Sequence, residues 1–187
     1  IDAYVIVTDD FHASEYVGEY FECRAFMSGF TGSAGTLLVL AEEAALWTDG
    51  RYFLQARDQL EGTGILLMKS GQKDVPGISE FLKEKLWDGA CLAYDGRTIN
   101  AAYARKLRED LSGKEIVFSE ENDLVGELWE DRPAFPSGKI WSLDEKYSGM
   151  SCGDKEAAVR EQMKKLGADY HLLASLDDIA WLYNIND

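Results

Sequence analysis

Short hydrophobic segments separated by polar turns divide the first two thirds of the chain into strands and helices. Residues 4–7, Tyr-Val-Ile-Val, are β-branched or aromatic and stop at a Thr-Asp-Asp turn, which is typical of a buried strand. Residues 36–40 and 44–47 are two further apolar runs separated by Ala-Glu-Glu. Two such runs around a short polar connection predict a β-hairpin.

Helical and strand patterns alternate after the hairpin. Apolar residues recur at spacings of three and four in the predicted helices and form continuous short runs in the predicted strands. The predicted order is helix 55–60, strand 65–68, helix 78–86, strand 91–94, helix 101–111 and strand 115–118. This alternation predicts an α/β fold in which helices flank a sheet, and the hairpin makes that sheet mixed.

The pattern changes between residues 131 and 153, where two of the three prolines lie and no helical or strand period continues. We therefore predict a linker there. Residues 154–166 form a predicted helix that starts at Gly153/Asp154 and ends at Gly167, with Glu-to-basic pairs at four-residue spacing. Residues 170–174 are predicted as a strand.

Residues 169–185 faintly repeat the order of residues 3–30, because each stretch runs from a strand through an acidic turn to an aromatic segment. The predicted organisation is therefore a first domain at 1–130, a linker at 131–153, and at 154–187 the truncated start of a second, similar domain. A piece of fewer than about 40 residues rarely folds alone.

Composition excludes two classes of function. The 187 residues carry 19 basic and 34 acidic side chains, a net charge of −15, whereas nucleic-acid binding needs a basic face. The longest apolar runs are far below the roughly 20 residues of a membrane span. Three cysteines without CxxC spacing indicate unpaired thiols and a cytoplasmic compartment.

Local motifs offer little chemistry. Two histidines, His12 and His171, cannot form a metal cage by themselves, and His171 is interpreted as a hydrogen-bonded structural histidine within the strand 170–174. The glycine-rich segment 29–35 lacks the pattern of a phosphate-binding loop. A nucleophile-and-base reading of residues 12–15, His-Ala-Ser-Glu, has no supporting elbow motif.

Two smaller expectations concern helix starts and tryptophans. The adjacent Asp177 and Asp178 diverge in direction, so they are interpreted as a helix cap and not as a metal pair. Trp47 and Trp181 are predicted to have structural roles.

Longer motifs carry a specific resemblance. The segments are Asp-Phe-His-Ala-Ser-Glu-Tyr at 10–16, Arg-Ala-Phe-Met-Ser-Gly-Phe-Thr-Gly-Ser-Ala-Gly-Thr at 24–36, Leu-Trp-Thr-Asp-Gly-Arg-Tyr-Phe-Leu-Gln-Ala at 46–56, Trp-Glu-Asp-Arg-Pro at 129–133 and Leu-Asp-Asp-Ile-Ala-Trp-Leu-Tyr-Asn at 176–184. In this order they closely resemble the amino-terminal part of three-domain Xaa-Pro aminopeptidases, which begins with creatinase/prolidase-type domains.

The resemblance implies a fragment of a larger enzyme. In that family a carboxy-terminal pita-bread domain binds two manganese ions through two Asp, one His and two Glu, and none of these ligands has a counterpart here. We therefore expect no catalytic residue and no metal in this chain, and an inactive fragment. The parent is expected to be a cytoplasmic homodimer that removes the first residue from peptides with proline in second position.

One residue of the family's substrate contact is present. The resemblance implies that Arg51, in Thr-Asp-Gly-Arg-Tyr at 48–52, reaches the substrate. A planar guanidinium suits a peptide carbonyl or carboxylate. The alternative role for Arg51 is a structural salt bridge to Asp49 or another acid. The alternative function for the chain is a non-catalytic, histone-chaperone-like module that binds a basic protein, with which the charge of −15 is compatible.

Overall fold

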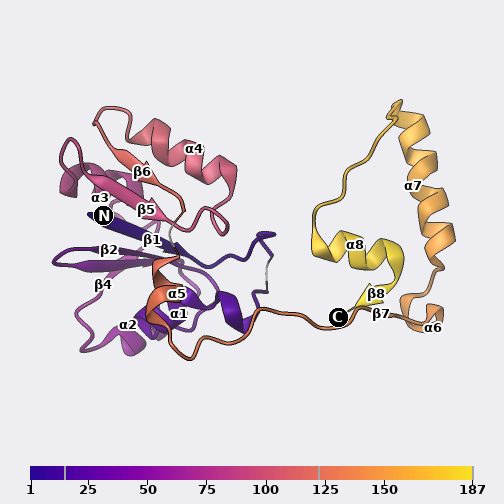
Figure 1. The fold of residues 1–187 in the computed structure, drawn as a ribbon, viewed down its shortest axis with the longest axis horizontal. Helices are drawn as coiled ribbons and strands as arrows, with labels where there is room; N and C mark the ends of the chain where they lie inside the picture. Colours follow the sequence, from indigo (N-terminus) through magenta and orange to yellow (C-terminus); the bar gives the residue numbers. More distant parts are fainter. Residues whose placement is uncertain (15, 122, 187) are drawn as a thin grey trace. The chain divides into compact units, whose positions relative to one another are not determined.

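The computed structural model describes residues 1–14, 16–121 and 123–186. The chain divides into two compact units, Ile1–Ala134 and Phe135–Asp187 (Figure 1).

The first unit is built on a six-stranded sheet with the order β4-β3-β2-β1-β5-β6. Its strands are β1 (Ala3–Val7), β2 (Thr36–Leu40), β3 (Ala44–Thr48), β4 (Leu66–Lys69), β5 (Cys91–Tyr94) and β6 (Val117–Ser119). Strand β2 is antiparallel to both of its neighbours, whereas the pairs β1–β5, β3–β4 and β5–β6 are parallel. The five strands other than β2 therefore end at the same edge of the sheet.

Helices cover both faces of this sheet. They are the 3-10 helix η1 (Glu19–Phe21), α1 (Cys23–Ser28), α2 (Phe53–Leu60), α3 (Ile78–Lys85), α4 (Ala101–Asp110) and α5 (Leu124–Leu128). Helices α3 and α4 lie on one face, and α1, α2 and α5 lie on the other (Figure 1). Side chains of the strands alternate between two buried clusters, one under α3 and α4 and one under α1, α2 and α5.

The predicted mixed sheet flanked by helices is confirmed, with each predicted strand and helix of this unit present within two residues of its expected ends. Three short elements, η1, α1 and α5, were not predicted from periodicity. Each of them has six residues or fewer. This is less than two helical turns, so no helical period can appear in the sequence. Trp47 is buried against Phe81, with ring centroids 5.3 Å apart, in the structural role expected of it.

The second unit contains β7 (Trp141–Ser142), α6 (Glu145–Ser148), α7 (Cys152–Leu166), α8 (Leu176–Tyr183) and β8 (Ile185–Asn186). Strands β7 and β8 pair antiparallel. A buried lysine, Lys155, joins the helices, because its Nζ donates to the Trp181 carbonyl at 2.8 Å and to Asn184 Oδ1 at 2.6 Å. Asn184 Nδ2 in turn donates to the Met150 carbonyl at 2.9 Å.

Several predictions for this unit were wrong. Residues 170–174 form no strand, since no other described strand lies beside them to pair their backbone groups, and His171 is exposed in that segment instead of lying within a strand. Helix α7 starts two residues earlier than predicted, because the Ser151 hydroxyl accepts the Asp154 amide. Ser175, not the acidic pair that follows it, occupies the N-cap of α8.

Other details of this unit qualify or confirm the sequence interpretation. Elements β7 and α6 occupy part of the segment 131–153, for which no regular structure was expected. Trp181 is about half exposed, with Lys155 Nζ 4.6 Å from its ring centroid. Gly167 takes the expected left-handed cap, with φ of 66°, and both predicted ion pairs of α7 are formed.

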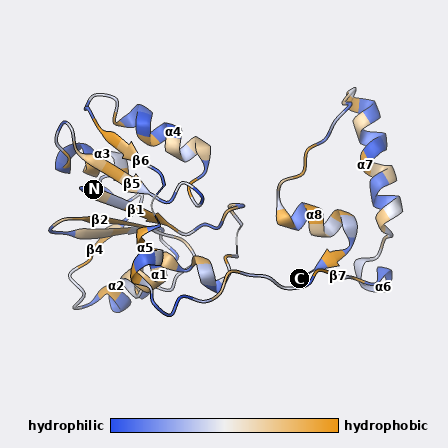
Figure 2. Ribbon diagram, viewed as in Figure 1, coloured by the Kyte–Doolittle hydropathy of each residue, from blue (hydrophilic) through white to orange (hydrophobic). Residues whose placement is uncertain are grey.

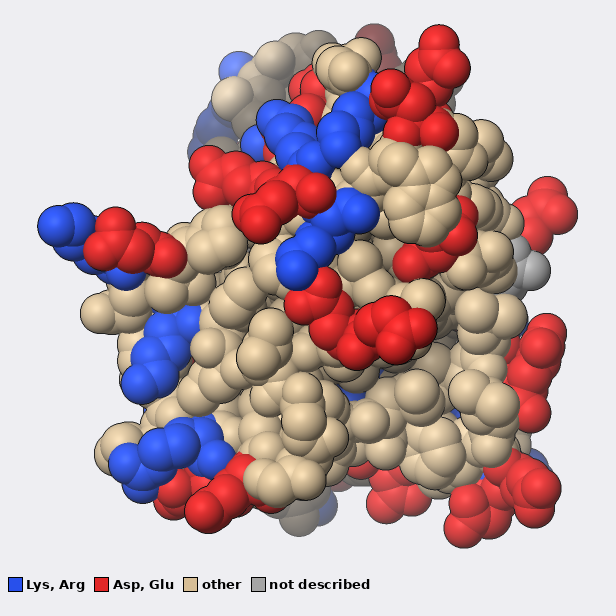
Figure 3. Space-filling view, turned by 90° about the vertical axis from the view of Figure 1, so that its left-hand side faces the viewer, with Lys and Arg blue, Asp and Glu red and all other residues tan. Residues whose placement is uncertain are grey.

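Hydrophobic and charged residues are unevenly distributed over the structure. Figure 2 shows hydrophobic residues on β5 and β6 and hydrophilic residues along much of α7. Figure 3 shows acidic side chains spread over one end of the sheet with Lys and Arg side chains among them. Lys85 and Glu43 form a partly buried ion pair at 2.6 Å. No helix of the described segments is long and apolar enough to span a bilayer.

Candidate functional site

Strands β1, β3 and β5 all end at one edge of the sheet. The chain leaves β1 toward the face covered by α1, whereas it leaves the neighbouring parallel strand β5 toward the face covered by α4 (Figure 1). Adjacent parallel strands whose connections diverge in this way leave a crevice outside their carboxyl ends, and ligands of α/β proteins bind there.

Arg51 lies at this edge, in the turn that follows β3. The Asp49 carboxylate accepts hydrogen bonds from the Arg51 backbone amide at 3.0 Å, from Nε at 2.9 Å and from Nη2 at 2.8 Å. These bonds from Arg51 hold the pKa of Asp49 below its usual range. The Arg51 side chain is nevertheless 69% exposed. The turn thus orients a planar guanidinium toward solvent.

The ion pair with Asp49 is the structural alternative considered for Arg51 in the sequence. It does not exclude a contact with a substrate, because a guanidinium carries five N–H donors and the Arg51 side chain is 69% exposed.

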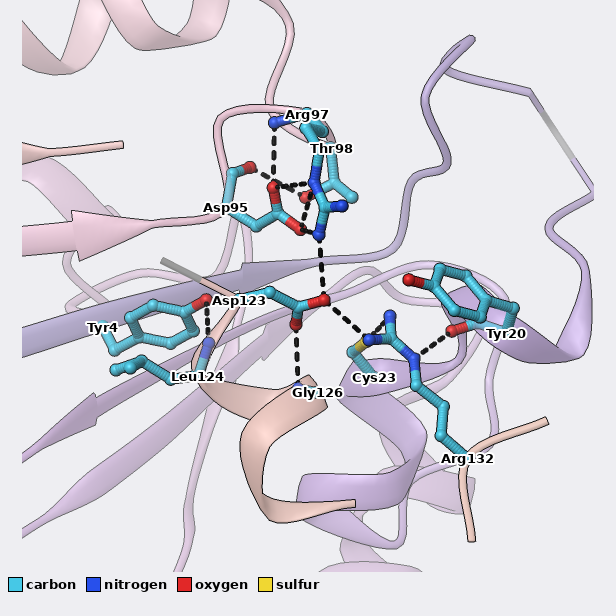
Figure 4. A network of polar contacts seen from close by, with 10 residues as sticks. All are labelled: Tyr4, Tyr20, Cys23, Asp95, Arg97, Thr98, Asp123, Leu124, Gly126 and Arg132. Carbon is cyan, nitrogen blue, oxygen red and sulfur yellow. Dashed lines mark hydrogen bonds and ion pairs between the residues drawn. The ribbon is translucent and has the colours of Figure 1, made fainter. Parts of the chain in front are cut away.

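A second Asp-Gly-Arg turn follows β5 and has the same geometry. Asp95 accepts from the Arg97 amide at 3.0 Å, from Nε at 2.9 Å and from Nη2 at 2.7 Å. Here a further carboxylate intervenes, because Arg97 Nη2 also donates to Asp123 at 2.9 Å (Figure 4). The bonds to Asp95 and Asp123 raise the pKa of Arg97 above its usual value. The 95–97 turn is therefore tied to the segment after β6 through Asp123.

Asp123 is the centre of this framework. Figure 4 shows Arg97 and Arg132 approaching its carboxylate from two sides. Arg132 donates to Asp123 at 2.7 Å, to the Tyr20 carbonyl at 2.9 Å and to Cys23 Sγ at 3.1 Å. Burial raises the pKa of the Cys23 thiol, so this cysteine stays protonated and is a poor nucleophile. The network thus holds Arg132, near the end of the first unit, against Tyr20, Cys23 and Asp123. None of the described residues in it is a reactive group.

The glycine-rich segment 29–35 is held by a buried arginine that sequence reasoning did not single out. Arg24 is only 4% exposed and donates to Thr8 Oγ1 at 2.5 Å, to the Phe30 carbonyl at 2.7 Å and to the Gly32 carbonyl. Burial lowers the pKa of Arg24 to about 10. A Cβ on Gly32 would lie 2.3 Å from a Phe30 ring carbon, which explains this glycine by close packing.

A pocket of about 590 Å³ opens beside this segment, at the same edge of the sheet. Its wall is formed by the ends of β1 and β3, the start of β2, and the first residues of α3 and α4; the lining residues are Val7, Thr8, Asp9, Ser33, Ala34, Gly35, Thr36, Trp47, Thr48, Asp49, Ser70, Gly77, Ile78, Ile99, Asn100 and Tyr103. Asp49 thus belongs both to the pocket and to the turn that carries Arg51. Arg51 itself does not line the pocket.

The structure gives no support for a catalytic nucleophile and base at residues 12–15. Asp10 is buried and accepts the backbone amides of His12 at 2.8 Å and Ser14 at 3.0 Å. Burial alone would raise the pKa of Asp10, but these hydrogen bonds lower it below its usual range. His12 is exposed, and Glu15 lies outside the described residues. This segment is a turn organised by Asp10.

The residues that the structure describes do not fit a metal site, since they contain no group of three or more His, Cys, Asp or Glu side chains placed to hold an ion. The three cysteines are unpaired, as the sequence predicted.

Family models identify both parts of the chain. Residues 1–124 and 131–186 match two models that are both described as creatinase/prolidase N-terminal domain. The chain therefore belongs to the creatinase/prolidase N-terminal domain family. The second match begins at residue 131, and the division into a first domain, a linker at 131–153 and the start of a second domain at 154–187 stays a prediction.

Individual relatives are Xaa-Pro aminopeptidases. The chain is 42% identical to aminopeptidase P2 of Arabidopsis thaliana and 38% identical to a Xaa-Pro aminopeptidase of Drosophila melanogaster, in each case over 99% of its length. It spans only 26% and 30% of those proteins.

Solved structures agree with the sequence relatives. An X-prolyl aminopeptidase from Caenorhabditis elegans, described as a cytosolic enzyme with a di-nuclear active site, matches 99% of this chain and 30% of its own chain, with a TM-score of 0.86 and 34% identity. An aminopeptidase P from Streptococcus thermophilus matches 68% of this chain and 84% of its own, with a TM-score of 0.50 and 21% identity, and so shares the fold.

Proposed function

We propose that this chain is the amino-terminal part of a manganese-dependent Xaa-Pro aminopeptidase, which removes the first residue from peptides with proline in second position. The observation that carries the proposal is the match over 99% of the chain to enzymes of that name, in sequence and in fold. Two manganese ions are held by a carboxy-terminal domain that this chain does not include. The chain supplies substrate-access and assembly surfaces and is inactive alone.

Within this enzyme Arg51 contacts the peptide substrate. The geometry of the turn supports this contact. Asp49 orients the guanidinium, and the Arg51 side chain stays 69% exposed at the carboxyl edge of the sheet. The equivalent arginine of the second turn, Arg97, is bound by two carboxylates and is assigned no such role.

The test is steady-state hydrolysis of a Xaa-Pro peptide by the full-length, manganese-loaded enzyme. Arg51→Ala is expected to lower kcat/KM about tenfold or more, because it removes a charge-assisted contact worth about 1.5–3 kcal/mol. Arg51→Lys should recover only part of this, since an ammonium lacks the guanidinium's paired donors.

The matched control is Arg57→Ala. Arg57 is another exposed arginine of the first unit, 63% exposed and paired with Asp58 at 2.7 Å. Its removal should leave kcat/KM unchanged. Equal kinetics for the Arg51→Ala variant and the unaltered enzyme would exclude the substrate contact, and absence of Xaa-Pro hydrolysis by the full-length protein would exclude the proposed activity itself.

The parent enzyme is further proposed to be a cytoplasmic homodimer that acts on peptides and uses neither nucleic acid nor membrane as a partner. Support comes from the cytosolic relative and from the charge of −15. The relatives give no support to the alternative of a histone-chaperone-like binding module, because they are named as aminopeptidases.

A further inference from the structure

The residue that follows Arg51 supports its guanidinium from a second direction. The Asp49 carboxylate accepts hydrogen bonds from Nε and Nη2 of that guanidinium. The guanidinium also lies over the face of the Tyr52 ring, with Arg51 Cζ 5.2 Å from the ring centroid. The negative face of an aromatic ring attracts a cation at this distance. Both neighbours thus restrict the direction of a side chain that is 69% exposed.

The glycine-rich segment 29–35 fixes the Tyr52 ring in turn. The Tyr52 and Ser33 hydroxyl oxygens form a hydrogen bond of 2.6 Å. The ring packs edge-on against Phe30, with centroids 6.0 Å apart and an interplanar angle of 77°. A Cβ on Gly32 would lie 2.8 Å from Cδ1 of the tyrosine, so the backbone of Gly32 lies directly against the ring. These contacts hold the tyrosine ring at its tip, its edge and its side.

The same glycine-rich segment is anchored to the elements on either side of the turn that carries Arg51. Arg24 binds two carbonyls of the segment from its buried side. The Thr48 hydroxyl, at the end of β3, donates to the Ala34 carbonyl at 2.6 Å. Gln59 Oε1, on α2, accepts the amide of residue 31 at 3.0 Å. The ring of the tyrosine is therefore held by a segment that is itself tied to β3 and α2.

We propose that Tyr52 is a positioning residue for Arg51, whose ring holds the guanidinium in the direction from which it contacts a peptide. A long side chain loses rotameric freedom when it binds a ligand, and this ordering weakens binding. A guanidinium that is already oriented in the free protein loses less. The inference rests on the proposed contact between Arg51 and the substrate, and it adds the residue that prepares that contact.

The second Asp-Gly-Arg turn orients its arginine with different groups. The residue after Arg97 is Thr98, which has no ring. The Arg97 guanidinium instead binds Asp123 at 2.9 Å and lies over the Phe11 ring, with Cζ 5.1 Å from the centroid. Both of these groups come from other segments of the chain. In the first turn the aromatic ring belongs to the turn itself.

The kinetic test is a double-mutant cycle in the full-length, manganese-loaded enzyme with a Xaa-Pro peptide. Tyr52→Leu should lower kcat/KM about two- to fivefold, which is the equivalent of one cation–π contact at an exposed site. In the Arg51→Ala background the same change should have almost no effect, because the guanidinium that the ring orients is absent. Unchanged kcat/KM for Tyr52→Leu alone, or an equal decrease in both backgrounds, would overturn the proposal.

The matched control is Phe118→Leu, which also removes an aromatic ring beneath an arginine. Arg108 Cζ lies 4.2 Å from the Phe118 ring centroid, and Phe118 is on β6, which β2, β1 and β5 separate from β3. The control should leave kcat/KM unchanged. A decrease equal to that of Tyr52→Leu would show that activity follows general destabilisation, and it would overturn the positioning role.

Side-chain NMR signals of Arg51 in the 187-residue chain give a readout without hydrolysis. The ring current of Tyr52 should displace the Arg51 Hδ and Hε signals, and Tyr52→Leu should move them toward those of the exposed Arg57. Tyr52→Phe and Ser33→Ala remove the same hydrogen bond but keep the ring. They should therefore give smaller, equal shifts and retain most of the activity. Unchanged Arg51 signals in Tyr52→Leu would overturn the proposal, and if that variant does not fold, unchanged signals in the other two would do so.

The positioning role and the substrate contact fail in different ways. If Arg51→Ala leaves kcat/KM unchanged, the substrate contact is wrong and the inference built on it falls as well. If Arg51→Ala lowers kcat/KM while Tyr52→Leu does not, the positioning role alone is wrong and the substrate contact stands.

Discussion

Replacement of Arg24 by Met tests whether a buried guanidinium holds the glycine-rich segment in place. Arg24 is 4% exposed, and its side chain donates to the Thr8 hydroxyl and to the carbonyls of Phe30 and Gly32. Methionine has a comparable unbranched stem but offers no donor, so the two carbonyls would stay buried without these partners.

The expected cost follows from these three bonds. Each hydrogen bond from a charged donor contributes about 1.5–3 kcal/mol net, and burying the apolar methionine returns about 1–2 kcal/mol. The free energy of unfolding should therefore fall by about 3–8 kcal/mol, which corresponds to a decrease in Tm of at least about 10 °C for a unit of this size. Amides of residues 31–35 should also lose protection from hydrogen exchange.

The assay is urea unfolding followed by tryptophan fluorescence, with Arg57→Met as the matched control. Arg57 is exposed and forms a single surface ion pair, so its loss should change the free energy of unfolding by less than about 1 kcal/mol. A cost below about 1 kcal/mol for Arg24→Met, or equal costs for the two variants, would refute the assigned role. Arg24→Lys should be intermediate, because lysine keeps the charge but not the planar fork.

Two further predictions concern acid stability and activity. Burial would raise the pKa of Asp123, but hydrogen bonds from Arg132, Gly126 and Arg97 lower it. A carboxyl whose pKa is lowered in the folded state stabilises the fold above its unfolded value of about 4, and this contribution disappears as the pH falls through the folded value. Asp123→Asn should therefore cost about 2–3 kcal/mol at pH 7, by urea unfolding, and progressively less below pH 4; a cost independent of pH would contradict this. The 187-residue chain, assayed with manganese and a Xaa-Pro peptide, should show no hydrolysis above buffer, and clear turnover would contradict the proposed division between domains.

Local sequence patterns were reliable where neighbours in the sequence are also neighbours in space. The hairpin of β2 and β3 and the ten-residue helix α4 each follow from residues within their own segment. Local patterns failed for residues 170–174, because an apolar run becomes a strand only where another strand pairs with it. His171 was misplaced for the same reason.

The site was only partly visible in the sequence. The turn that carries Arg51 was found through a motif, and its structural pairing with Asp49 was one of the two expected roles. Arg24 gave a weak signal as the one charged residue in an otherwise uncharged stretch ahead of the glycine-rich segment. The pocket gave no signal in the sequence, because its wall joins segments as far apart as residues 9 and 103, which only the parallel pairing of β1 with β5 brings together.

The sequence by itself determined the class of fold, the strand and helix order of the first unit, and the family resemblance through its motifs. These features depend on short-range periodicity and on contiguous residues. Only the tertiary structure decided that the Arg97 turn is joined to Asp123, that the Arg51 side chain is 69% exposed, and that a pocket partly lined by Asp49 lies at the same edge of the sheet. Those outcomes depend on which groups, distant in the sequence, the fold brings together in its low-dielectric interior. The order of residues along the chain does not specify these contacts.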